Sequence, residues 1–184
     1  MSSAPLAHRL FFAVRPPSPL DVQIGNFAET EAGGGPRIRS EYLHTTLAIS
    51  GDFATEPTHA MAGFMEAGHH IAAAPFDMTV DRLAGSRRSV ALRPSRRSDE
   101  LFALQRQIAD VLRRIGLALR DGWGFSPHIT LFYRDGVPFN RTVTGFCWRV
   151  EELVLIHSLV GRTEHHVLGR WPLRGRDDPQ LSLF

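Results

Sequence analysis

The sequence predicts an α+β fold, because short strand-like apolar segments alternate with amphipathic helical segments and most neighbouring strands can pair antiparallel. The chain has 184 residues, of which 43% are hydrophobic and 22% are charged. This composition is typical of a globular protein with a hydrophobic core. The length fits one domain, or two small lobes that share one interface.

The first half of the chain is expected to contain two strand–helix units followed by a hairpin. Its strand segments are apolar runs that end at proline, glycine or arginine, and its helical segments carry apolar residues three and four positions apart. The strands are expected at residues 9–14, 42–50, 76–83 and 90–93, and the helices at residues 18–31 and 56–72. Residues 85–89 are expected to form the hairpin turn.

The second half begins with the strongest helix signal. Ser98 is a good N-cap, the acidic residues after it suit the positive end of the helix dipole, and Gly116 ends the helix. One apolar stripe runs along this helix and consists of Leu101, Leu104, Ile108, Val111, Leu112 and Ile115. Strands are expected to follow at residues 126–133, 150–159 and 163–171, and a turn at Gly161–Arg162 is expected to join the last two as a hairpin.

The two halves share the pattern His-x-Thr-Leu, which begins at His44 and again at His128. Of the nine histidines, only these two have a hydroxyl residue two positions later, Thr46 and Thr130. Residues two apart on a strand face the same way, roughly 6–7 Å from each other. An imidazole can give or take a proton, and a hydroxyl can bind a phosphate oxygen. Two facing pairs would hold a phosphate between an acid and a base, whereas the alternative is a pair of buried structural histidines.

The basic residues and the cysteine exclude several kinds of chemistry. All 21 basic residues are arginine, so a lysine–AMP intermediate, a P-loop lysine and a Schiff base are excluded. The net charge of +2 does not indicate nucleic-acid binding by bulk electrostatics. Cys147 has no partner for an internal disulfide and is expected to be a small buried residue.

Nothing in the sequence predicts a membrane span or a signal peptide. No apolar run approaches the ~20 residues that a membrane helix needs. The start, residues 1–9, lacks a basic segment followed by an apolar one. We therefore expect a cytoplasmic protein that does not contact a membrane.

The two motifs resemble the paired His-x-Thr-x motifs of the 2H phosphoesterase superfamily. Within it, the sequence most resembles the bacterial RNA 2′,3′-cyclic phosphodiesterases, also called 2′-5′ RNA ligases. The resemblance extends from about residue 8 to residue 173, and its supporting matches are Arg9–Val14, Pro127, Leu153–Ser158 and His166–Leu173.

This resemblance implies a bilobal, pseudo-symmetric fold with two antiparallel sheets lining a central cleft and helices outside. It implies hydrolysis of RNA 2′,3′-cyclic phosphate ends to 2′-phosphomonoesters without metal or nucleotide cofactor, with 2′-5′ ligation as the reverse reaction. By carry-over, His44 would be the proton donor and His128 the proton acceptor, while Thr46 and Thr130 would bind the phosphate. The alternative is a protein that binds RNA ends or nucleotides in the same cleft without turnover.

Other residues near the two motifs are candidates for binding the substrate. Arg134 lies two residues beyond the place where the family often has an arginine, and on an unbroken strand it would share the face of His128 and reach phosphate. Ala48 stands where the family often has a basic or bulky residue. Phe11, Phe132 and Tyr133 could stack on a terminal base, with core packing as the alternative.

The remaining histidines and the paired arginines favour structural or surface roles. His69–His70 diverge by about 100° on a helix, and His165–His166 alternate on a strand, so neither pair predicts a metal site. His157 could approach the cleft, but a structural role is expected. Arg87–Arg88 and Arg96–Arg97 are expected to be solvated loop residues, with contact to the RNA chain as the alternative.

We expect residues 1–173 to form a single bilobal domain and residues 174–184 an exposed tail. The segment Gln180–Phe184 resembles the pentapeptide that bacterial proteins insert into the DNA polymerase sliding clamp. The alternative is that this segment docks on the chain's own surface. The expected partner at the cleft is RNA with a 2′,3′-cyclic phosphate end or a small cyclic nucleotide, bound by a monomer.

Overall fold

The computed structural model describes residues 7–162 and 164–175 of the chain. This part contains eight strands, three α-helices and one 3-10 helix. In chain order they are β1 (Ala7–Val14), α1 (Leu20–Glu31), η1 (Ser40–Tyr42), β2 (Thr45–Ile49), α2 (Thr58–His69), β3 (Phe76–Gly85), β4 (Ser89–Arg93), α3 (Asp99–Arg114), β5 (Ile129–Tyr133), β6 (Phe139–Val150), β7 (Glu152–Val160) and β8 (Glu164–Pro172).

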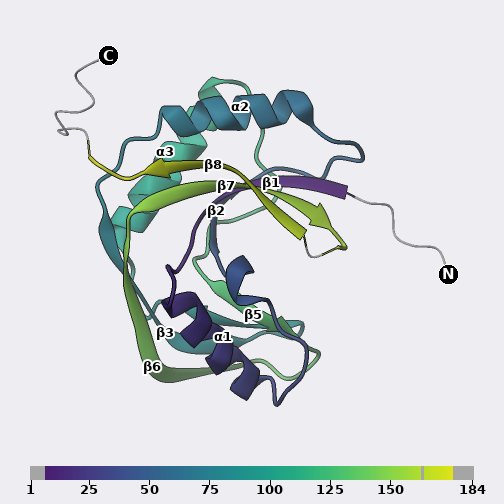
Figure 1. Ribbon diagram of the computed structural model, residues 1–184, viewed down its shortest axis with the longest axis vertical. Coiled ribbons are helices and arrows are strands. Elements are labelled where there is room, and N and C mark those ends of the chain that lie inside the picture. Colours follow the sequence, from purple (N-terminus) through teal and green to yellow (C-terminus); the bar gives the residue numbers. More distant parts are fainter. Residues whose placement is uncertain (1–6, 163, 176–184) are drawn as a thin grey trace.

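The strands form two four-stranded sheets in which all neighbours are antiparallel (Figure 1). The strand order is β2-β1-β7-β8 in the first sheet and β5-β4-β3-β6 in the second. The α+β fold with two antiparallel sheets is therefore confirmed, as are the β3–β4 and β7–β8 hairpins. Both motif strands, β2 and β5, lie at an edge of their sheet.

Two of the three described helices contact the sheet opposite to the one that precedes them in the chain. Helix α1 follows β1 of the first sheet but contacts β5 of the second, and α3 follows β4 of the second sheet but contacts β2 of the first. Helix α2 covers β7 and β8 (Figure 1). None of the helices in the described part of the chain is long and apolar enough to cross a membrane.

Strand β1 separates a large core from a smaller apolar cluster on the cleft side. Leu10, Phe12 and Val14 point into the large core, which also contains residues of the second sheet such as Leu83 and Leu92. The intervening residues of β1 point to the opposite face and form the small cluster of Phe11, Ala13, Val154 and Ile156. This alternation is the period of two expected of a strand. One core therefore supports both sheets.

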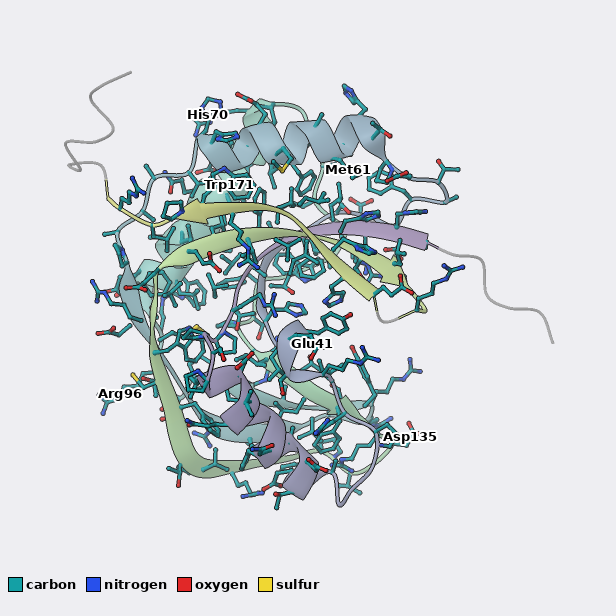
Figure 2. All side chains as sticks on the ribbon, viewed as in Figure 1. Glu41, Met61, His70, Arg96, Asp135 and Trp171 are labelled. Carbon is teal, nitrogen blue, oxygen red and sulfur yellow. The ribbon has the colours of Figure 1, made fainter. Side chains whose placement is uncertain are left out.

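Helix α2 packs closely on β8 because two glycines leave room for Trp171. A Cβ on Gly68 of α2 would lie 2.2 Å from the Trp171 ring, and one on Gly169 of β8 would lie 2.4 Å from it. Figure 2 shows Trp171 between the helix and the sheet. A side chain at either position would push α2 away from the sheet.

Most features predicted for helix α3 are confirmed. The Ser98 hydroxyl accepts a hydrogen bond from the Leu101 amide at 3.2 Å, and Gly116 takes a left-handed conformation with φ of 78°. The predicted stripe is buried except for Ile115, which is 41% exposed. Ile115 was wrongly placed in the core because the helix ends at Arg114, before the next apolar turn is complete.

The second sheet contains a strand that the apolar pattern did not predict. Strand β6 pairs with β3 along its length, yet most of its residues are exposed, because it lies at the sheet edge. An exposed edge strand needs no apolar face, so hydrophobic periodicity does not reveal it. Cys147 lies on this strand and is exposed, so the prediction that it is buried was wrong.

Candidate active site

A cleft of about 440 Å³ opens between the two sheets and contains both His-x-Thr motifs. Its walls come from β1, β2, β7 and β8 of the first sheet, from β5 of the second, and from the loops between them. The lining residues include His44, Thr46, His128, Thr130, Phe11, Tyr42, His165, Arg9, Arg120, Trp123 and Tyr133. Two motifs from opposite halves of the chain therefore meet in one cavity.

Each of the two motif histidines makes the same kind of hydrogen bond to a backbone carbonyl. The Nδ1 atom of His44 donates to the Tyr42 carbonyl at 2.6 Å, and that of His128 donates to the Ser126 carbonyl at 2.7 Å. A carbonyl only accepts, so both rings carry a proton on Nδ1. In the neutral form, each Nε2 atom is left as an acceptor. Each histidine directly precedes its strand, instead of lying within it as predicted.

A bulge of the same kind follows each histidine. In the first motif Thr46 pairs with Ala13, and in the second Thr130 pairs with Ala91. In both strands the register shifts at the next residue, so that Leu47 and Leu131 have no partner across the ladder and are fully buried. The threonine and the leucine point to opposite faces by ordinary strand alternation. The bulge lets the residue after each leucine, Ala48 or Phe132, face the large core as well.

The chain segment before each motif also donates a backbone hydrogen bond to the strand of the other motif. The Ile38 amide, ahead of the first motif, donates to the Leu131 carbonyl at 2.7 Å. The Arg120 amide, ahead of the second motif, donates to the Ile49 carbonyl at 2.8 Å. These reciprocal bonds connect the segment before each motif to the edge strand that carries the other motif.

Burial keeps the cleft histidines neutral near pH 7. It lowers the pKa of His44 to about 4, against the opposing effect of the Tyr42 carbonyl, and the charges of His165 and Arg15 add to the lowering. Burial also lowers the pKa of His128, with a smaller contribution from Arg93. A neutral imidazole with Nε2 unprotonated is ready to act as a base, whereas an acid must first gain a proton.

A third histidine, His165, was not predicted at the site. Its ring lies edge-on to His44 with centroids 5.5 Å apart and also contacts Tyr42 at 4.8 Å. Burial lowers its pKa to about 4, and its Nδ1 atom is buried with no hydrogen-bond partner within the described residues. The sequence carried only a weak signal, since β8 faces the cleft through alternate residues and either of His165–His166 could have been the inward one.

Only some of the residues predicted to contact substrate line the cleft. Phe11 lines the cleft, but it is 3% exposed and stacks on His44 with centroids 4.8 Å apart, so its ring supports the histidine. Arg134 lies beyond the end of β5, where it donates to the Val137 carbonyl at 3.3 Å and lies over the Phe139 ring. It does not line the cleft. Of the other aromatic residues, Phe132 is buried in the core and Tyr133 is 70% exposed at the cleft.

The other histidines lie outside the cleft. His157 is buried and its Nε2 atom lies 2.9 Å from Nδ1 of His8, which supports a structural role. His69 accepts a hydrogen bond from Trp171, whereas His70 pairs with Glu66. Within residues 7–162 and 164–175, no three histidine, cysteine or acidic side chains are grouped to hold a metal ion.

The two arginines that face the cleft are not those that the sequence singled out. Arg87–Arg88 and Arg96–Arg97 belong to the loops around β4 and do not line it, and Figure 2 shows Arg96 at the outer surface. Arg9 and Arg120 line it instead. Arg9 lies on a strand that was predicted from its apolar residues, whereas Arg120 lies in the loop between α3 and β5, for which no role was predicted.

Two antiparallel sheets that each present a His-x-Thr motif to one cleft have the arrangement of the 2H phosphoesterase class. The family model of the 2′-5′ RNA ligase superfamily matches residues 16–162, so the chain belongs to this superfamily. Membership of this superfamily supports an enzyme that acts on phosphoesters. A comparison with curated proteins gives no match.

Solved structures agree with this assignment. The chain is 26% identical to Escherichia coli LigT in complex with 3′-AMP, with a TM-score of 0.71 over 91% of this chain and 98% of that one. It is 28% identical to a structure described as a phosphoesterase, with a TM-score of 0.71 over 91% and 99% of the two chains. The protein TT0787 of Thermus thermophilus, at 22% identity and a TM-score of 0.72 over 91% and 99%, shares the fold.

Proposed function

We propose that this protein hydrolyses the 2′,3′-cyclic phosphate at RNA ends to a 2′-phosphomonoester, with His44 and His128 as the acid–base pair. The observation that carries the proposal is the matched presentation of the two histidines. Each is held through Nδ1 by the carbonyl two residues before it, and each is followed by a threonine that lines the same cleft. LigT has been crystallised with 3′-AMP and with phosphate, which supports a nucleotide phosphate as the ligand.

The proposed reaction needs one proton acceptor and one proton donor. His128 takes a proton from water through Nε2 while the water oxygen bonds to phosphorus. The bond from phosphorus to the 3′ oxygen breaks, and His44 donates a proton from Nε2 to that oxygen. The products are a free 3′ hydroxyl and a 2′-phosphate. The hydroxyls of Thr46 and Thr130 would hold the non-bridging phosphate oxygens during this displacement.

The low pKa of His44 is compatible with its role as the acid. A cyclic phosphate is an anion, and an anion beside a buried imidazole favours the protonated form of the ring. Substrate binding would therefore raise the pKa of His44 and supply the proton that the free protein mostly lacks. An acid of low pKa also gives up its proton readily once the 3′ oxygen begins to leave.

Replacing either histidine should remove most of the activity. We expect His44→Ala and His128→Ala each to lower kcat about 10²–10⁴-fold, the usual contribution of one general acid or base. The measurement is the rate at which an oligonucleotide with a 2′,3′-cyclic end gains one water, followed by mass spectrometry. His166→Ala is the matched control, because His166 is exposed on β8 and does not line the cleft.

The same assay separates hydrolysis from simple binding. Retention of the cyclic-ended RNA by the wild-type protein without any gain of water would support a nucleotide-binding protein that uses the same cleft. Full activity in the His44→Ala/His128→Ala double variant would refute the assignment of the two histidines.

A further inference from the structure

Two arginines and one aspartate form a cluster at the edge of the cleft. Arg9 on β1 binds both carboxylate oxygens of Asp52, with Nε 2.7 Å from Oδ1 and Nη2 2.9 Å from Oδ2. Arg120, in the loop before the second motif, donates a short hydrogen bond from Nη2 to the same Oδ1 atom. Both arginines also line the cleft that holds His44 and His128.

This cluster carries an excess of positive charge. The Arg9 hydrogen bond is the largest effect that lowers the pKa of Asp52, so the carboxylate stays ionised and neutralises one of the two guanidinium groups. Within the described part of the chain, Asp52 is the only side-chain partner of either arginine. Nη1 of Arg9, together with Nε and Nη1 of Arg120, is therefore left with N–H groups to donate. The two side chains are 25% and 31% exposed, so a ligand can reach them.

A structural role alone does not account for both arginines. Arg9 already satisfies the two oxygens of Asp52 in the bidentate geometry that suits a carboxylate. Arg120 shares one of these oxygens and adds a second cation to a site that one cation neutralises. Guanidinium groups with unused donors at the rim of a phosphate-binding cleft are suited to bind another phosphate.

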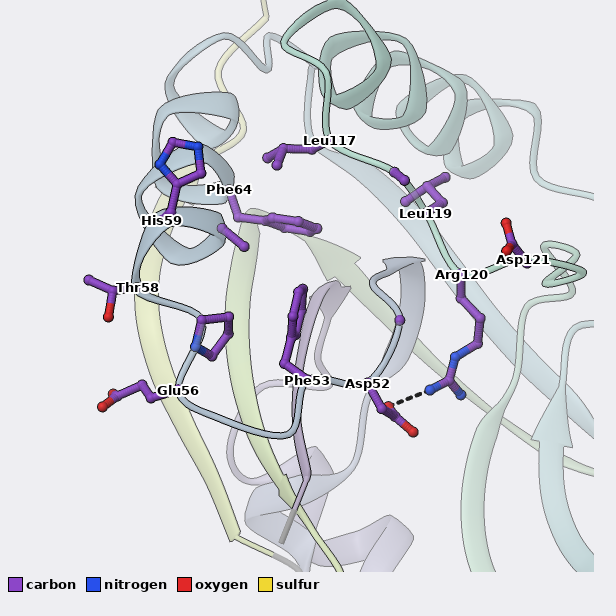
Figure 3. A pocket seen from close by; sticks show the side chains of 14 residues that line it. Asp52, Phe53, Glu56, Thr58, His59, Phe64, Leu117, Leu119, Arg120 and Asp121 are labelled. Carbon is purple, nitrogen blue, oxygen red and sulfur yellow. Dashed lines mark hydrogen bonds and ion pairs between the residues drawn. The ribbon is translucent and has the colours of Figure 1, made fainter.

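The cluster lies between the cleft and a second cavity. Asp52 and Arg120 also line a mainly apolar pocket of about 760 Å³, whose walls include Phe53, Phe64 and Leu117. Figure 3 shows the two phenylalanine rings in this pocket, with the Asp52–Arg120 ion pair at its side. A ligand longer than one nucleotide that leaves the cleft toward this pocket would pass the guanidinium groups first.

We propose that Arg9 and Arg120, bridged by Asp52, bind the phosphodiester that joins the terminal nucleotide of an RNA chain to the one before it. This inference rests on the proposed function, because it takes the cyclic phosphate to lie between the two histidines. The subsite makes the enzyme selective for chain ends, since a mononucleoside 2′,3′-cyclic phosphate has no second phosphate to offer. Selectivity therefore comes from one local contact and not from the net charge of the protein.

The test compares adenosine 2′,3′-cyclic phosphate with the dinucleotide ApA that ends in the same cyclic phosphate. We expect the wild-type protein to have the higher kcat/KM on the dinucleotide. Arg120→Gln should lower the ratio of the two kcat/KM values roughly tenfold, the effect of losing one charge-assisted hydrogen bond, and mainly through KM. Arg106→Gln removes the same charge from α3, outside both cavities, and should leave the ratio as it is.

A neutral substrate tests the same contact without altering the protein. Replacing the internal phosphodiester of the dinucleotide with a methylphosphonate removes its charge, and we expect the wild-type kcat/KM to fall by a similar factor. Arg120→Gln should then cause little further loss on the methylphosphonate, because the contact is already missing.

The outcomes separate the subsite from the reaction. Equal wild-type kcat/KM on the charged and neutral dinucleotides would overturn the subsite, as would an Arg120→Gln variant that lowers kcat/KM equally on the mononucleotide and the dinucleotide. In both cases the wild-type protein still hydrolyses the cyclic phosphate, and the proposed function stands. Hydrolysis of neither substrate would overturn the proposed function and this inference with it.

Discussion

Three imidazole rings in the cleft have their positions and their pKa values set by the surrounding protein. His44 and His128 are fixed in the same tautomer by carbonyl groups, and His165 lies beside His44 with one nitrogen that has no partner among the described residues. All three have a lowered pKa, chiefly because burial disfavours the charged ring. Perturbed pKa values that gather in one cleft are typical of a catalytic site.

The lowered pKa values predict an acidic pH optimum. One histidine must be protonated and the other neutral, so kcat/KM should be bell-shaped, with both apparent pKa values of the free enzyme below the usual 6.5. Above the higher pKa the acid is lost, and kcat/KM should fall about tenfold per pH unit. The measurement is kcat/KM from about pH 4 to about pH 9. A profile that is flat or rising between pH 7 and pH 8 would contradict the burial of the pair.

At the scale of elements, the two motif strands share one construction. Each is an edge strand, each has a bulge at the leucine of its motif, and each pairs a threonine with an alanine of the neighbouring strand. Behind the first motif strand lies α3, whose contact with β2 stabilises that edge. The stability of α3 therefore contributes to the position of Thr46.

The N-cap of α3 offers a stability test at this scale. We expect Ser98→Ala to lower the free energy of unfolding by about 1 kcal/mol, because the Leu101 amide loses its acceptor. Ser98→Asp should retain most of the stability, since aspartate caps helices as well as serine does. Urea denaturation followed by circular dichroism measures both. Equal losses in the two variants would show that the cap contributes little.

At the scale of the whole molecule, two sheets and a cleft rest on one core. The largest buried cluster contains residues of both sheets, and helices α1 and α3 cross from one sheet to the other. The reciprocal backbone bonds of Ile38 and Arg120 connect the loop before each motif to the strand of the other motif. We therefore propose that the two lobes are halves of one folding unit, in line with the single bilobal domain expected from the sequence.

A single core predicts that the two sheets unfold together. Native-state hydrogen exchange should give the slowest amides of β1 and of β3 the same opening free energy, equal to the global free energy of unfolding. A clearly lower opening free energy in one sheet would instead identify two independent lobes. The wild-type chain suffices for this measurement.

Much of the fold and half of the site could be predicted from local patterns. The stripe and cap of α3, the two hairpins and the two motifs each depend on residues close in the chain, where periodicity and spacing are informative. Exposed β6 was missed because an edge strand needs no apolar face. The predicted clamp-binding segment Gln180–Phe184 lies outside the described residues and remains a prediction.

The sequence by itself determined the candidates for acid–base chemistry, because His44 and His128 with their threonines form a pattern within four residues. Only the tertiary structure decided which other side chains join them. Arg134 turns away because its strand ends one residue earlier, whereas His165, Arg9 and Arg120 reach the cleft from three separate segments. Contacts between distant segments depend on strand register, bulges and loop paths, and these are set by the packing of the whole core and not by any local run of residues.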